Sequence, residues 1–232
     1  ETHCEDEATV KKNLEQAIAI YGDDIPMEKH PEIRSEQACY ISSSQAIALA
    51  KKTGARLHVF HLSTAKETKL FDKKKPLKDK KITAEVCVHH LWFTSEDYAS
   101  KGSKIKWNPA VKTKKDREGL WKALNEGRID VIATDHAPHT LEEKDNVYTK
   151  APSGGPLVQH ALEALFEMHR KGYITVEKLV EKIAHNPAIL FEIQDRGYIR
   201  EGYKADLVLI NPNAPWTVTK ENIAYKCGWS PF

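Results

Sequence analysis

The stretch Arg128–His139, RIDVIATDHAPH, decides the fold, because it joins a strand-like apolar run directly to a group of polar residues. Its apolar run is too continuous for a strand with one wet face, so we expect a strand that is covered on both sides. Asp135, His136 and His139 follow the run at once. In parallel α/β proteins the functional groups lie where strands end, and this stretch therefore predicts a site at the carboxyl edge of a sheet.

Similar apolar stretches precede this one, with helical patterns between them. Strands are predicted over 55–63, 81–90 and 128–135, and helices over 5–22, 35–52, 115–127 and 156–172, with a further helix beginning at 64–72. Strands that alternate with helices predict parallel strands joined by crossover helices, as in a doubly wound sheet or a (β/α)8 barrel. The stretch 197–218 has strand and turn character, and it predicts the start of a separate small β unit.

The charge balance argues against a nucleic-acid or membrane partner. The 232 residues carry a formal net charge of +2, and no apolar run is long enough to cross a bilayer. The Lys-rich run Asp72–Lys81 has no interleaved aromatic residues and is expected to be a solvated loop. We therefore expect a soluble globular protein whose main partner is neither a nucleic acid nor a membrane surface.

The four cysteines, Cys4, Cys39, Cys87 and Cys227, are scattered without a CxxC pair. This pattern favours reduced thiols and a cytoplasmic location over a disulfide scaffold. The chain begins ETHCEDE without Met and stops at KCGWSPF, so we expect it to be part of a longer polypeptide.

Three residues are candidate metal ligands, because each lies at an expected strand end or just before a helix. They are His3 in THCEDE, His61 at the end of RLHVFH, and Asp135 after DVIAT. Each residue taken singly is also typical of a capping or core residue. Two imidazoles and a carboxylate together are the ligand types that suit zinc in a hydrolytic site.

Seven segments, taken in order, resemble the second half of the dihydroorotases of the amidohydrolase superfamily. They are THCEDE, HVFHLSTAKE, TAEVCVHHLWFT, KWNPAVK, VIATDHAPHT, APSGGPLVQHAL and GYKADLVLINP. The resemblance implies that residues 1–192 form about strands 5 to 8 of a (β/α)8 TIM-type barrel, and that residues 193–232 begin a small β-rich domain. It also implies a cofactor of one or two Zn²⁺ ions bound by His3, His61 and Asp135.

The resemblance further implies the reversible conversion of dihydroorotate and N-carbamoyl-L-aspartate, a step of pyrimidine biosynthesis. Asp135 would be the catalytic acid and base, while Asn108, His139 and Gly154 would contact the substrate. Two departures are Lys112, where many relatives have arginine, and the SGGPLVQ loop. The HxH motif, the strand 4 ligand and the arginine that binds the substrate carboxylate are expected to precede Glu1.

Two other functions stay open. One is another cyclic amidase, such as a dihydropyrimidinase, hydantoinase or allantoinase; His139 and Asn108 argue against it, because a neutral ring offers them no carboxylate. The other is an inactive homologue that acts as a scaffold for a partner enzyme. The resemblance is compatible with a homodimer or with association with aspartate transcarbamoylase. No role is predicted for His136, and His89 and His90 are expected to be structural or to support a metal ligand.

Overall fold

A computed structural model describes residues 1–232. Its sheet contains the parallel strands β1 (Leu57–Val59), β2 (Ile82–Cys87) and β3 (Val131–Ala133), which lie side by side in chain order. Thr2 forms a parallel bridge to Val59, so the N-terminal segment takes the next position in the sheet. Four neighbouring positions in chain order are what consecutive strands of a (β/α)8 barrel occupy.

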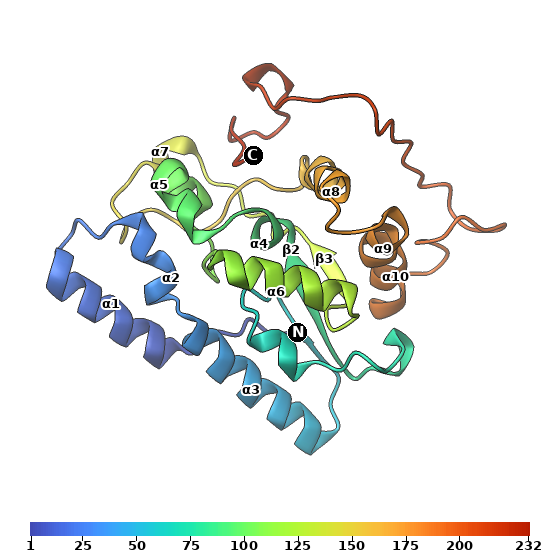
Figure 1. The fold of residues 1–232 in the computed structure, drawn as a ribbon, viewed down its shortest axis with the longest axis horizontal. Coiled ribbons are helices and arrows are strands. Elements are labelled where there is room, and N and C mark those ends of the chain that lie inside the picture. Colours follow the sequence, from blue (N-terminus) through green and yellow to red (C-terminus); the bar gives the residue numbers. More distant parts are fainter.

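Helices connect these strands and enclose them (Figure 1). Before β1 come α1 (Glu7–Tyr21), α2 (His30–Ile33) and α3 (Glu36–Thr53); between β2 and β3 come α4 (Val88–Trp92), α5 (Tyr98–Lys101) and α6 (Lys114–Asn125); after β3 come α7 (Leu141–Lys144), α8 (Ala161–Arg170), α9 (Val176–Val180) and α10 (Asn186–Leu190). A π-helical turn over Glu181–His185 joins α9 to α10. The α/β class and the parallel sheet are confirmed.

Local signals fix the ends of the two long N-terminal helices. The Asp6 carboxylate accepts a hydrogen bond from the Thr9 N–H at the start of α1, and Ser35 does the same for Ala38 at the start of α3. Gly22 and Gly54 end the helices with φ of +59° and +73°, which only glycine adopts freely. The predicted helices over 5–22 and 35–52 are confirmed.

Two predicted elements differ from the structure. The helix expected from 64–72 is a single 3₁₀ turn, Glu67–Leu70, because Phe71 then turns to an extended backbone that buries its ring in the core. The strand expected over 81–90 ends at Cys87, and His89 and His90 lie in α4. Helical spacing puts Val88 and Leu91 on one buried face, whereas a strand would place them on opposite faces.

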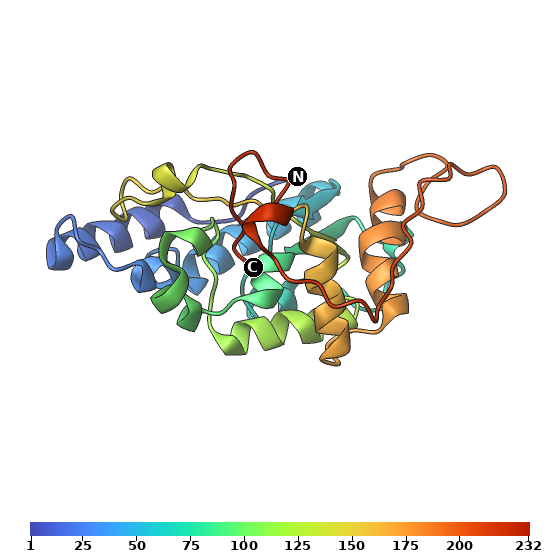
Figure 2. The ribbon, with the colours of Figure 1, turned by 90° about the horizontal axis from the view of Figure 1, so that it is seen from above.

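The stretch predicted to begin a small β domain contains no strand. Residues 193–232 hold only a 3₁₀ turn at Lys220–Asn222, and the segment after α10 extends away from the helices (Figure 2). The Lys204 N–H donates to the Asp195 carbonyl at 2.9 Å, but no ladder of such bonds follows, and Leu209 is fully exposed. The chain end packs back, since Trp229 is buried and Phe232 contacts Trp92. The division between residues 1–192 and 193–232 stays a prediction.

One large core lies around the sheet and includes residues from β2, α4, α6 and α8. Its most buried members include Val86, Leu91, Trp107, Leu124 and Leu157. The Lys-rich run is an exposed loop, as predicted, except for Lys80, which is buried against Asp130. None of the helices combines the length and apolarity needed to span a bilayer.

Candidate active site

The two predicted histidine ligands lie side by side at one edge of the sheet. His3 follows the bridge made by Thr2, and His61 follows β1 by two residues. The Nδ1 atom of His3 lies 2.6 Å from the Nε2 atom of His61. Burial, helped by the neighbouring His3, lowers the pKa of His61 to about 4. His61 is therefore neutral near pH 7, as a metal-binding imidazole must be.

Asp135 lies two residues after β3, at the same edge of the sheet. Burial raises the pKa of its carboxyl group, and His3 acts in the opposite direction. The structure does not gather the three predicted ligands into one tight cluster, because the Asp135 carboxylate stands apart from the histidine pair. His3 is nevertheless close enough to influence it electrostatically.

His61 and Asp135 share an unusual backbone conformation. Their φ angles are +36° and +50°, in the left-handed region that residues other than glycine rarely adopt. Such a conformation costs on the order of 1–3 kcal/mol and is found most often at functional sites. Two imidazoles and a carboxylate at the same edge of the sheet are the ligand types that suit a zinc ion of the kind that hydrolases bind.

The three predicted substrate-binding residues come together through Ser153. The Ser153 hydroxyl donates to Asn108 Oδ1 at 3.0 Å, and the His139 Nε2 atom lies 3.2 Å from the Ser153 carbonyl oxygen. Gly154 follows directly, and its N–H donates to the Lys106 carbonyl. Residues that are far apart in the sequence thus form one continuous surface.

Gly154 leaves no room for a side chain. A Cβ atom there would lie 2.5 Å from the Ala137 carbonyl oxygen and 3.3 Å from the His139 ring, and its φ of +127° is accessible only to glycine. The loop therefore presses its backbone against the segment that carries His139. This close approach explains the glycine at that position.

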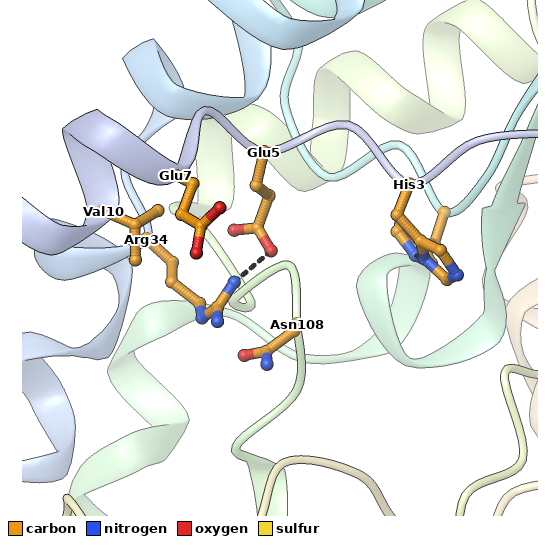
Figure 3. Close-up of a pocket in the computed structure, with 7 residues that line it drawn as sticks. His3, Glu5, Glu7, Val10, Arg34 and Asn108 are labelled. Atoms are coloured by element: carbon orange, nitrogen blue, oxygen red, sulfur yellow. Dashed lines mark hydrogen bonds and ion pairs between the residues drawn. The ribbon is translucent and has the colours of Figure 1, made fainter.

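A cleft of about 350 Å³ lies between the histidine pair and Asn108. It is lined by His3 and His61 on one side and by Asn108, Glu5 and Arg34 on the other (Figure 3). Figure 3 shows the Arg34 guanidinium reaching toward Asn108 while it is held by an ion pair with Glu5. Sequence reasoning missed Arg34 and Glu5, because no local motif marks them and only the fold brings them to the cleft.

Two buried lysines hold the loop that carries Ser153 and Gly154. Lys144 Nζ donates to the carbonyls of Pro152 and Gly154, both at 2.8 Å, and Lys106 Nζ donates to the Tyr148 carbonyl at 2.7 Å. Burial lowers the pKa of Lys106 to about 8 and that of Lys144 to about 7. Sequence reasoning also missed this pair, since each lysine alone is typical of a solvated surface.

The structure gives His136 and Lys112 supporting positions. His136 Nδ1 accepts from the Leu157 N–H at 3.0 Å, which anchors the segment before α8. Lys112 is buried, and its Nζ donates to the Ala110 carbonyl at 3.0 Å rather than facing the cleft. The substitution of lysine for arginine noted in the sequence therefore lies beside the cleft and not in its lining.

A family model and several curated proteins match most of this chain in sequence. The model of the amidohydrolase family matches residues 1–229. Dihydroorotase from Carboxydothermus hydrogenoformans is 41% identical over 187 residues, covering 80% of this chain and 43% of that protein. Dihydroorotase from Clostridioides difficile is 34% identical over 241 residues, covering 97% of this chain and 56% of that protein. The chain therefore spans about half the length of the curated relatives it matches.

The most similar solved structures include cyclic amidases. A D-hydantoinase (dihydropyrimidinase) from a Thermus species superimposes with a TM-score of 0.84 at 25% identity, over 95% of this chain and 49% of that one. An L-hydantoinase from Arthrobacter aurescens gives a TM-score of 0.80 at 26% identity, over 88% and 46%. These structures share the overall fold of this chain.

Proposed function

This chain belongs to the amidohydrolase family, and from that membership we propose that it is the C-terminal half of a zinc-dependent dihydroorotase. The reaction would be the reversible hydrolysis of dihydroorotate to N-carbamoyl-L-aspartate, a step of pyrimidine biosynthesis. His3, His61 and Asp135 would supply part of the metal ligand set. The remaining ligands would come from the region that the longer relatives possess and this chain does not span.

One observation carries the proposal: Asn108 belongs both to the cleft beside the histidines and to the group formed with His139. It lines the cleft with His3 and His61, and it accepts the Ser153 hydroxyl. A small cyclic molecule in the cleft would therefore touch the histidine ligands and the Asn108 amide together, and Ser153 links that amide to His139. That is the arrangement needed to cleave a ring while its substituents are held.

Dihydroorotate fits better than a neutral ring. The relatives named dihydroorotase are 32–41% identical to this chain, whereas the hydantoinase structures described above are 25–26% identical. Dihydroorotate carries a carboxylate that hydantoins lack, and His139 and Asn108 offer donors for it. Activity on hydantoins or dihydropyrimidines is the second candidate, and the structural likeness to hydantoinases favours it.

The bound zinc ion and Asp135 would have separate roles in the reaction. Bound zinc would lower the pKa of a water molecule toward neutrality and polarise the scissile carbonyl. Asp135 would accept a proton from the attacking water and pass it to the ring nitrogen that leaves. Burial raises the pKa of Asp135, which brings its basicity closer to what proton transfer near neutral pH requires.

The decisive experiment compares substrates on the full-length protein and on its His139→Ala variant. A charge-assisted hydrogen bond is worth roughly 1.5–3 kcal/mol, so the variant should lose about ten- to a hundredfold in kcat/KM for dihydroorotate. The loss for dihydrouracil, which has no carboxylate, should be much smaller. His185→Ala, at a site where the imidazole stacks on Tyr198 instead, is the control and should change neither.

Three outcomes would count against the proposal. Equal losses on both substrates would give His139 a structural role, and faster turnover of dihydrouracil than of dihydroorotate by the unaltered protein would establish the second candidate. Absence of turnover on either substrate, with zinc bound, would leave the scaffold hypothesis. A cytoplasmic location and a homodimer or aspartate transcarbamoylase partner are parts of the same proposal.

A further inference from the structure

Three side chains at the junction of β2 and α4 form a cluster that the proposed reaction does not use. Cys87 ends β2, and His89 and His90 lie in the first turn of α4. The sulfur atom and one ring nitrogen from each histidine lie within 4.8 Å of one another. All three residues are at most 2% exposed. The abrupt change from strand to helix brings these neighbouring residues to one point.

Three of the four ring nitrogens in this cluster have no hydrogen-bond partner. Both ring nitrogens of His89 and the Nδ1 atom of His90 are buried and unpaired. An unpaired buried polar group costs about 1–3 kcal/mol, and native proteins contain few of them. The Trp107 ring stacks on His89 with centroids 4.3 Å apart, which fixes the orientation of that imidazole. Three such atoms in one place indicate that something else binds them.

The hydrogen bond made by His90 prepares it to bind a cation. Its Nε2 atom lies 3.0 Å from the Pro109 carbonyl oxygen, which can only accept, so Nε2 carries the hydrogen. In the neutral ring the buried and unpaired Nδ1 atom then holds a free lone pair. Burial lowers the pKa of His90 to about 3 and that of His89 well below its usual range, so both rings are neutral. Metal-bound histidines are held in this way by backbone carbonyls.

We propose that Cys87, His89 and His90 bind a single divalent cation of the zinc and cobalt class, at a site separate from His3, His61 and Asp135. A thiolate with two imidazoles selects such borderline cations over magnesium or calcium. Zinc bonds of about 2.0 Å to nitrogen and 2.3 Å to sulfur place ligand atoms roughly 3.5 Å apart. The ligand atoms here lie within 4.8 Å of one another, so they need to close by no more than about 1.3 Å.

Binding of a cation at this site releases one proton from the Cys87 thiol. Burial raises the pKa of the Cys87 thiol well above its usual range, so the side chain is protonated without a cation. The cation replaces that proton, the S–H bond breaks, and one proton is released to solvent. Because the cluster is enclosed, the ion would enter during folding and exchange slowly. It would then fix the turn between β2 and α4, independently of whether the protein is a dihydroorotase.

Cobalt spectroscopy on the full-length protein tests this site without any activity measurement. After the protein has been unfolded, freed of metal and refolded with Co²⁺, a thiolate ligand gives a near-ultraviolet charge-transfer band. His3, His61 and Asp135 contain no sulfur, so they cannot produce it. We expect the band in the unaltered protein, its loss together with one equivalent of cobalt in Cys87→Ser, and its retention in Cys39→Ser. Cys39 is an equally buried control whose sulfur faces the Ser63 hydroxyl.

The proposal would be overturned by the absence of the band in the unaltered protein, or by a band that survives in Cys87→Ser. If Cys87→Ser does not fold, X-ray absorption at the zinc edge of the unaltered protein, and of Cys39→Ser, decides instead. A sulfur neighbour at about 2.3 Å is then expected in both proteins. A zinc environment of nitrogen and oxygen alone would exclude Cys87 as a ligand.

Discussion

Replacing Lys80 by methionine should destabilise the fold strongly without touching the cleft. Lys80 Nζ lies 2.7 Å from the Asp130 carboxylate and 2.7 Å from the Gly127 carbonyl oxygen. The two charged side chains are 4% and 3% exposed. The other carboxylate oxygen of Asp130 accepts the Ala84 N–H at 3.1 Å. Lys80→Met leaves this carboxylate buried beside β2 and β3 without its ion-pair partner, so that only the more distant electrostatic effect of Lys182 remains.

The expected loss of stability depends on whether the Asp130 carboxylate stays charged or takes up a proton. Breaking a buried ion pair by removing one partner costs about 3–5 kcal/mol. The carboxyl group can instead take up a proton, and from its ordinary pKa of 3.8 this costs about 1.36 kcal/mol per pH unit, or about 4 kcal/mol at pH 7. Burial already raises the pKa of Asp130 despite Lys80, and the loss of Lys80 raises it further. The expected loss is therefore about 3–4 kcal/mol at pH 7.

The same reasoning predicts how the stability of the Lys80→Met variant depends on pH. A carboxyl group with a raised folded-state pKa binds its proton more tightly in the folded state, so the variant becomes less stable as pH rises. At pH 5 protonation costs only about 1.5 kcal/mol, so the loss should shrink to that value. Urea unfolding of the full-length protein at pH 5 and pH 7 measures both figures.

Two further variants make this prediction decisive. Lys78→Met, which removes an exposed lysine from the same loop, should change the free energy of unfolding by less than about 0.5 kcal/mol. Adding Asp130→Asn to Lys80→Met should recover part of the loss, because the buried charge is then gone. A loss below about 1 kcal/mol at pH 7, or an equal loss at both pH values, would refute the burial argument.

The remaining predictions concern the candidate site. Asp135→Asn should reduce turnover by about a hundredfold or more while the fold and the bound metal stay unchanged. Kinetics, circular dichroism and metal analysis measure these three properties. Near-normal turnover would remove Asp135 from the mechanism. Gly154→Ala should raise KM by at least about tenfold, since the new Cβ would lie 2.5 Å from the Ala137 carbonyl oxygen. Gly172→Ala has a similarly positive φ but open space, so it should leave KM unchanged while costing about 1 kcal/mol of stability. The pKa of Lys144 is about 7 in the folded state against an ordinary value of 10.5, so between these pH values the side chain releases its proton on folding and the free energy of unfolding should rise with pH. Lys144→Met should flatten this rise, as urea unfolding at several pH values would show. An unchanged slope would contradict the burial of the Lys144 charge.

The sequence by itself determined the elements whose signals are local. Asp6 and Gly22 delimit α1, and Ser35 and Gly54 delimit α3, because a cap bonds only to backbone a few residues away. The sequence also located the strand ends that carry His61 and Asp135, since an apolar run followed by polar residues is visible without a fold. The motifs around Asn108, His139 and Gly154 predicted a shared site, and the hydrogen bonds through Ser153 are consistent with it.

Only the tertiary structure decided which residues surround that site and which predicted elements form. Arg34 reaches the cleft, and Lys106 and Lys144 lose their solvent, because segments distant in the sequence pack around them. The strand expected through His90 ended at Cys87 because core packing required a helix, and 197–218 formed no strand because it makes no ladder of backbone hydrogen bonds with a neighbouring segment. Burial, ion pairing and strand pairing depend on residues far apart in the chain, and no local pattern contains that information.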